Sequence, residues 1–165
     1  MKTYSPFEIS ALFLVALSHV LFAISMAMWV MFLWGCKPSL TINIPTLVEK
    51  GEFACLLFDS ALSGAFFLQH SGMIRRSFRR YLAKYVPTEY HGAIYTISSS
   101  IALLVALVFW QESSYIVIST PKNALFINLI HVSFVLAILC FLWALNALKS
   151  FDLCGTDPIL RQSGA

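Results

Sequence analysis

Charged residues are scarce in this sequence. Lys, Arg, Asp and Glu make up 12% of the 165 residues, whereas 59% are hydrophobic and the mean hydropathy is +0.78. An ordinary soluble domain is about a quarter charged and about half apolar. The composition therefore excludes a typical soluble domain and predicts that lipid surrounds much of the chain.

The patterns that usually indicate metal, nucleotide or hydrolytic sites are also missing. The four cysteines, at positions 36, 55, 140 and 154, form no Cys-x-x-Cys pair, so no zinc or iron–sulfur site is indicated. The seven glycines form no Gly-x-Gly-x-x-Gly loop, and neither Gly-x-Ser-x-Gly nor His-Glu-x-x-His occurs. Cys36 and Cys55 are expected near one membrane surface, where a disulfide or two separate small apolar side chains are both open alternatives.

Four long apolar stretches remain, and each predicts a transmembrane helix. They cover residues 7–34, 53–70, 92–110 and 124–148, which at about 1.5 Å per residue suffices to cross a hydrocarbon core about 30 Å thick. The first is too long for a signal-peptide core and is read as a retained span. We predict an all-α polytopic membrane bundle in which residues 1–165 form a single integral membrane domain.

Basic residues gather between the second and third stretches. They are Arg75, Arg76, Arg79, Arg80 and Lys84. The positive-inside rule puts this loop, and with it both termini, in the cytoplasm, so a multi-pass protein of the cell inner membrane is expected. We predict that these side chains contact anionic lipid headgroups, with a surface for an anionic ligand as the alternative. A net charge of +3 concentrated beside a span does not indicate a nucleic-acid partner.

Titratable side chains within the predicted spans are functional candidates, because an unpaired charge at that depth costs several kcal/mol. The helical rise places His19, Asp59 and His131 at a similar depth in the outer half, with Asn128 one turn from His131. This outer-half polar layer is either a structural hydrogen bond between helices or a site for a ligand, proton or metal. His19 and His131 are also candidate axial ligands of haem b.

A second polar group is expected at the inner surface. Gln69 and His70 end the second span, His91 opens the third span, and Asn146 and Asp152 flank the end of the fourth. Cytoplasmic solutes reach this level. The candidates for binding a ligand or substrate are Asp59, Gln69, His70, Ser71 and His91. No catalytic residue is assigned.

The run from Phe67 to Phe78, which contains Gln69-His70-Ser71, resembles the signature of the NnrU and methanethiol S-methyltransferase family of membrane proteins. The resemblance covers roughly residues 16–155. Further matching positions are Asp59, Pro87, Tyr95, Ser99, Ser100, Phe109-Trp110-Gln111 and Phe151-Asp152-Leu153-Cys154-Gly155. The resemblance implies a shared helical scaffold in which Asp59, Gln69 and His70 face a substrate cavity. His70-Ser71-Gly72 also looks like the corresponding run in the ζ-carotene isomerase branch of the same superfamily, whose members use haem.

The sequence departs from the family at several positions. His91 and Gly92 stand where the family has an acidic residue and Arg, and Lys149-Ser150 stands in place of Asn-His. The Arg-His-Pro motif, which in the methyltransferases precedes the spans that hold S-adenosylmethionine, does not occur in these 165 residues. The resemblance is therefore to the N-terminal half of the family, and this chain alone is not expected to hold S-adenosylmethionine.

Three functional hypotheses follow. The first is a protein that is non-catalytic alone and acts as a substrate-binding or accessory subunit of a membrane complex. The second is a thiol S-methyltransferase, dependent on S-adenosylmethionine, that lacks or borrows its C-terminal half. The third is a haem protein that uses two of its four histidines, His19, His70, His91 and His131.

Overall fold

The computed structural model describes residues 6–36, 41–111 and 123–147, together with Thr156 and Ile159; the side chains of residues 6–9 and 48 lie outside the description. Four helices are long and apolar enough to cross a membrane. These helices are α1 (Pro6–Leu33), α3 (Glu52–Ile74), α5 (His91–Val108) and α6 (Ala124–Ala147). No strand occurs in these ranges. The predicted all-α fold with four spans is therefore confirmed, whereas the cytoplasmic position of the termini stays a prediction.

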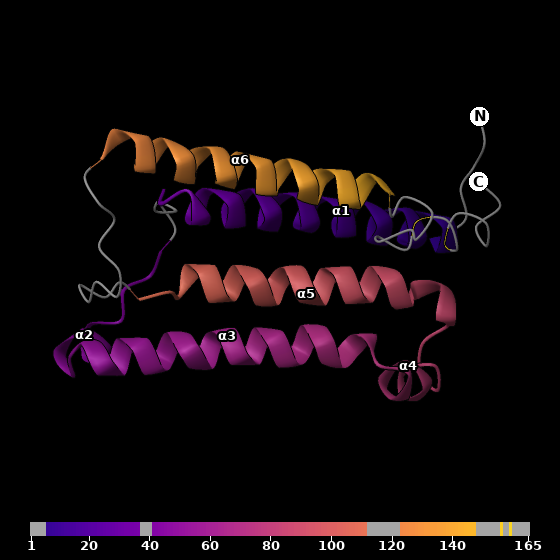
Figure 1. Cartoon of the computed structure of the whole chain (residues 1–165). Helices are drawn as coiled ribbons and strands as arrows, with labels where there is room; N and C mark the ends of the chain where they lie inside the picture. Colours follow the sequence, from indigo (N-terminus) through magenta and orange to yellow (C-terminus); the bar gives the residue numbers. More distant parts are fainter. Residues whose placement is uncertain (1–5, 37–40, 112–122, 148–155, 157–158, 160–165) are drawn as a thin grey trace. The chain divides into compact units, whose positions relative to one another are not determined.

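Three short helical elements connect the long ones: α2 (Pro45–Glu49), α4 (Arg76–Leu82) and the 3-10 helix η1 (Thr88–Tyr90). Gly51, between α2 and α3, has φ 91°, a conformation that glycine adopts without steric cost. Arg75 interrupts the path from α3 to α4 with an extended backbone, φ −62° and ψ 140°. The chain changes direction there, and Figure 1 shows α4 nearly end-on while α3 and α5 run across the view.

The chain divides into two compact units, residues 1–113 with 153–165, and residues 114–152. The second unit contains α6. Asn128, His131 and Trp143 are all exposed on this helix, and none of its 24 residues is buried.

Helix α5 forms the centre of the first unit. It packs against both α1 and α3 (Figure 1). Its buried residues are Ala93, Thr96, Ser99, Ser100, Leu103, Ala106 and Leu107. Most of these side chains are small, and small side chains let membrane helices approach closely.

Small side chains also follow one face of α1. Ala11, Ser18 and Ser25 are seven residues apart, and each is at most 1% exposed. The Ser18 and Ser25 hydroxyls donate to the carbonyls of Val15 at 2.8 Å and Phe22 at 3.0 Å. Both bonds stay within α1, so each hydroxyl donates to the backbone of its own helix.

The two ends of the α1–α5 pair are fixed by different contacts. At the end near α4, Ala11 and Ala93 pack with Ile159. At the opposite end, the rings of Phe32 and Trp110 meet edge to face with centroids 5.2 Å apart. This second end is called the Gln111 end below, because it also carries the polar cluster around that residue.

Cys36 and Cys55 are both free thiols, the first exposed and the second buried. The disulfide alternative is therefore not realised.

Candidate functional site

Asp59 is a buried acidic side chain in the middle of an apolar helix. It is 4% exposed on α3, and its Oδ1 accepts the backbone N–H of Gln111 at 2.9 Å. Gln111 follows the end of α5, so this bond joins α3 to the segment that leaves α5. A carboxylate at this depth is expected to have a partner, and here the partner is a backbone amide.

The Gln111 side chain extends the same cluster. Its Nε2 donates to the carbonyls of Ile42 at 3.0 Å and Phe109 at 2.7 Å, and its Oε1 accepts the Ile44 N–H at 3.0 Å. The Ile42 N–H donates in turn to the Val108 carbonyl at 2.7 Å. Every polar atom of the Gln111 amide is therefore occupied, and the cluster holds residues 41–44 against the end of α5.

The other members of the predicted outer-half layer do not share these bonds. His19 is exposed, and its Nδ1 donates to the Val15 carbonyl of its own helix at 2.8 Å. Asn128 and His131 belong to the unit that contains α6. The layer as a ligand site, and haem ligation by His19 and His131, stay predictions, whereas Asp59 and Gln111 form a structural contact.

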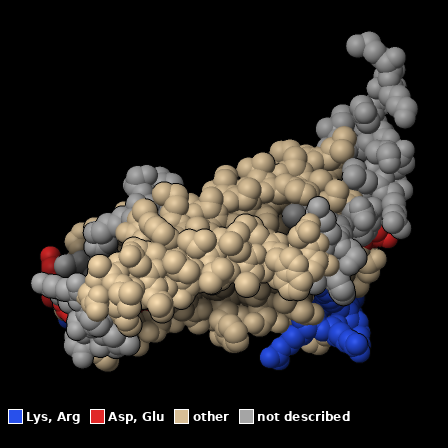
Figure 2. Space-filling model, turned by 45° about the horizontal axis from the view of Figure 1, so that its top comes forward, with Lys and Arg blue, Asp and Glu red and all other residues tan. Residues whose placement is uncertain are grey.

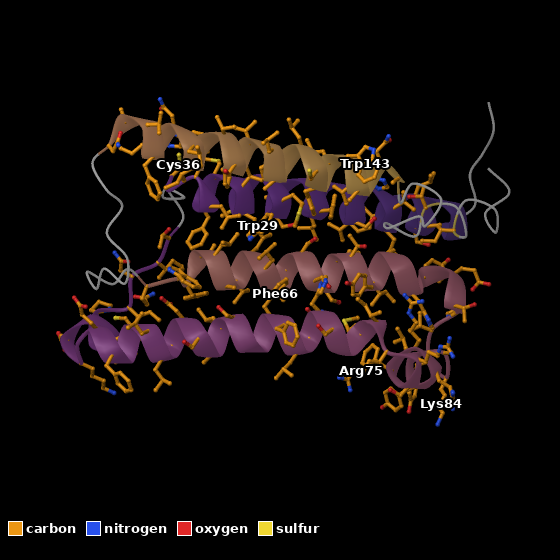
Figure 3. All side chains as sticks on the ribbon, viewed as in Figure 1. Trp29, Cys36, Phe66, Arg75, Lys84 and Trp143 are labelled. Carbon is orange, nitrogen blue, oxygen red and sulfur yellow. The ribbon has the colours of Figure 1, made fainter. Side chains whose placement is uncertain are left out.

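A second cluster lies where α3 and α5 face each other nearer to α4. The Tyr95 hydroxyl is 3.0 Å from Nε2 and 3.2 Å from Nδ1 of His70, so it can bond to whichever ring nitrogen the tautomer presents. The Phe66 ring stacks with the His70 ring, with their centroids 5.4 Å apart. Figure 3 marks Phe66 on the side of α3 that faces α5. Eleven residues of helix, about 16 Å, separate His70 from Asp59.

Gln69 brings an unsatisfied acceptor to this second cluster. Its Nε2 donates to the Met73 Sδ at 2.9 Å, while its Oε1 is buried and has no hydrogen-bond partner. The buried Ser99 hydroxyl, one turn beyond Tyr95, is near enough to that tyrosine to interact but forms no hydrogen bond of good geometry. Buried polar atoms are rarely left unpaired in native structures unless a ligand or water satisfies them. We call Phe66, Gln69, His70, Met73, Tyr95 and Ser99 the His70 cluster.

The remaining predicted ligand residues lie beside this cluster. Ser71 is half-buried on α3 directly after His70. His91 opens α5 and donates from Nε2 to the Val86 carbonyl at 3.1 Å, which ties the start of α5 to the loop before it. Arg79 of α4 lies close enough to Tyr95 to act on it electrostatically.

The His70 cluster has the features of a small ligand site. An imidazole exchanges one proton, an amide oxygen accepts a donor, and Met73 and Phe66 offer polarizable contacts that suit sulfur. Within the described ranges, no three His, Cys, Asp or Glu side chains gather as metal ligands would.

Sequence reasoning identified His70 and Asp59 but missed their partners. Tyr95, which contacts His70, appeared only as a position in the family pattern together with Ser99, and Gln111, which contacts Asp59, only as the end of a span. Their spacing carried a signal that could have been used: Tyr95 and Ser99 are four apart and share one face of a helix.

Comparison with characterised proteins confirms the resemblance to methanethiol S-methyltransferases. The chain is 32% identical to the enzyme of a Pseudomonas strain over 84 residues, which is 48% of this chain and 30% of the relative. It is 38% identical to that of Crocosphaera subtropica over 63 residues, 38% of this chain and 24% of the relative. It is 27% identical to that of Mycobacterium tuberculosis over 96 residues, 58% of this chain and 38% of the relative.

The similarity covers only part of each relative: the chain spans well under half of their length. No family model matches the chain, and no solved structure is significantly similar to it. The similarity supports the interpretation of this chain as a methyltransferase-like membrane protein.

Proposed function

We propose that this chain binds a small thiol at the His70 cluster and serves as a substrate-binding or accessory subunit of a methyltransferase complex in the inner membrane. Two findings support the proposal. The relatives are named as methyltransferases of methanethiol, and the buried Gln69 Oε1 has no partner beside the His70–Tyr95 pair. The unpaired oxygen is the observation that carries the proposal.

The chemistry of a thiol fits these groups. The S–H group is a weak donor that Gln69 Oε1 can accept, and the sulfur and its methyl group suit contacts with Met73 and Phe66. If the thiol ionises, its proton passes to the ring nitrogen of His70 that accepts it, while the Tyr95 hydroxyl orients the ring. Only the thiolate is an effective nucleophile, so binding here prepares the sulfur for methylation.

The proposal is tested by following the histidine rings. Full-length protein in detergent, carrying isotope-labelled histidine, is titrated with methanethiol, and the His70 signals are identified by their loss in His70→Gln. We expect these signals to shift on binding and Gln69→Leu to weaken the apparent affinity about threefold, since a hydrogen bond from a weak S–H donor is worth about 0.5–1 kcal/mol. His19→Gln is the matched control, because His19 bonds within its own helix, and it should leave the titration unchanged.

Two results would count against thiol binding at this place. In one, the His70 signals do not move at millimolar thiol. In the other, all histidine signals shift in parallel, which indicates partition of the thiol into the micelle rather than binding at one cluster.

The S-methyltransferase alternative is favoured by the names of the relatives, which are methanethiol S-methyltransferases. In that reading S-adenosylmethionine would supply the methyl group. Membranes that contain only this chain are incubated with methanethiol and S-adenosylmethionine, and dimethyl sulfide is measured in the headspace. Product formation that His70→Gln abolishes would replace the binding-subunit proposal with the enzyme.

A further inference from the structure

A strongly charged surface lies on α4 and the turn that follows it, beside the proposed thiol site. Arg76, Arg79, Arg80 and Lys84 are all exposed. At 100° per residue they fall within an arc of about 140° around the helix axis. Ala83 keeps a helical conformation, and the Lys84 N–H donates to the Tyr81 carbonyl at 3.2 Å, so the helical turn continues to Lys84. We call these four residues the basic face.

The opposite side of α4 is aromatic. Phe78, Tyr81 and Tyr85 are 36%, 57% and 71% exposed, and they fall within a separate arc of about 60°. The Tyr81 and Tyr85 rings meet edge to face with centroids 5.4 Å apart. Rings that combine an apolar body with a hydroxyl favour the boundary between headgroups and acyl chains.

Between positions 75 and 89 the sequence has five Lys and Arg residues and one acidic residue, Glu89, so positive charge is in excess around the basic face. Figure 2 shows the Lys and Arg side chains gathered into one patch, and Figure 3 marks Arg75 and Lys84 at the two ends of this segment. The patch needs anions from outside the segment to balance it.

The break at Arg75 determines how this surface is presented. Helix α4 runs across the direction of α3 (Figure 1). Because α3 is a candidate span, a helix that crosses its direction at its end lies along the bilayer surface rather than through it. The aromatic arc can then face the acyl chains, while the basic face lies above it at the level of the headgroup phosphates.

We propose that α4 is a binding surface for acidic phospholipids, in which the basic face contacts headgroup phosphates and the aromatic residues enter the headgroup boundary. Three of the four basic residues are arginines, whose planar guanidinium groups bind phosphate oxygens in pairs. A soluble phosphate ester presents the same oxygens but leaves the exposed aromatic arc without a partner. The amphipathic pattern therefore favours lipid.

The proposal is tested by the lipid selectivity of the full-length chain. The protein is reconstituted in phosphatidylcholine bilayers, and the association of spin-labelled phosphatidylglycerol is compared with that of spin-labelled phosphatidylcholine. We compare a triple variant, Arg76→Gln with Arg80→Gln and Lys84→Gln, with a matched triple variant, Lys37→Gln with Lys50→Gln and Lys122→Gln. Each removes three positive charges. Arg79 is kept so that the charge nearest Tyr95 in the His70 cluster stays unchanged.

We expect phosphatidylglycerol to be preferred several-fold by the unaltered protein. The α4 variant should lose the preference, since one basic residue near an anionic surface changes affinity by about fivefold. The matched variant and an Arg76→Lys with Arg80→Lys variant should keep most of it. Equal loss in both glutamine variants would overturn the proposal, as would the absence of any preference or displacement of the lipid by millimolar glycerol phosphate. Circular dichroism shows whether each variant remains folded.

Discussion

The structure of the Gln111 end depends on the side chain of Asp59. It is 4% exposed, and it accepts a hydrogen bond from a backbone amide 52 residues away. In Asp59→Leu the Gln111 N–H loses its acceptor in a buried position, which costs about 1–3 kcal/mol. We expect a lower midpoint of thermal unfolding in detergent, followed by circular dichroism, whereas Asp59→Asn keeps an acceptor oxygen and most of the stability. Ser60→Ala is the control because Ser60 is exposed. An unchanged midpoint for Asp59→Leu would show that the contact does not stabilise the fold.

The Gln111 side chain allows a more local test. Gln111→Leu removes the acceptor of the Ile44 N–H and the donor to the Ile42 carbonyl. We expect hydrogen exchange at the Ile44 amide to accelerate about tenfold or more, because the lost bonds release the backbone of residues 41–44. The amide of Leu103 in α5 is the internal reference and should keep its rate. If both amides accelerate together, the substitution has loosened the bundle as a whole.

From the sequence, the depth of each candidate residue along its helix was predictable, but the neighbours of its side chain were not. The rise per residue gives the depth of His19 and Asp59 to within a turn, but it does not give the direction in which each side chain points. His19 bonds to its own helix and is exposed, whereas Asp59 is buried. Each residue of error in the predicted start of a helix rotates the predicted position of a side chain by about 100° around the axis. Depth alone therefore could not pair these side chains. The family pattern added Tyr95, which does contact His70.

At the scale of elements, the long helices were predictable and their ends were not. The second stretch was expected to end at residue 70, but α3 continues to Ile74, because Gly72 and Met73 do not stop a helix. The third was expected to reach 110, but α5 ends at Val108, where the backbone turns to bring Gln111 toward Asp59. Apolar length determines a span, whereas specific hydrogen bonds over long sequence separations determine where it stops.

The junction between α3 and α4 allows a proline test. Arg75 already has the extended backbone that a residue before proline prefers, and Arg76 is the first residue of α4, where a backbone N–H has no intrahelical acceptor. We therefore expect Arg76→Pro to leave the unfolding midpoint unchanged or slightly raised. Arg79→Pro should destabilise α4 by about 3 kcal/mol, because the Arg79 N–H donates to the Arg75 carbonyl at 3.1 Å. Similar effects of both prolines, measured by circular dichroism in detergent, would contradict this description of the junction.

At the scale of the whole molecule, the orientation in the membrane can be tested with one native thiol and one introduced thiol. Cys36 is exposed after the end of α1, and Ser77 is exposed on α4. If the basic segment is cytoplasmic, a membrane-impermeant maleimide added to intact cells labels Cys36 but not Ser77→Cys. Labelling of Ser77→Cys should require permeabilised membranes. The background variant carries Cys140→Ala and Cys154→Ala. The opposite labelling order would invert the predicted topology.

The central helix of the first unit is also the shortest of the four long ones. With 18 residues, α5 is about 27 Å long, whereas the 23 residues of α3 extend over about 34 Å. A bilayer that matches α5 leaves the end of α3 projecting, and one that matches α3 buries the polar ends of α5. Hydrophobic mismatch at α5 therefore favours thinner membranes. Longer acyl chains should draw the polar residues at the ends of α5 into the hydrocarbon before they affect the longer spans.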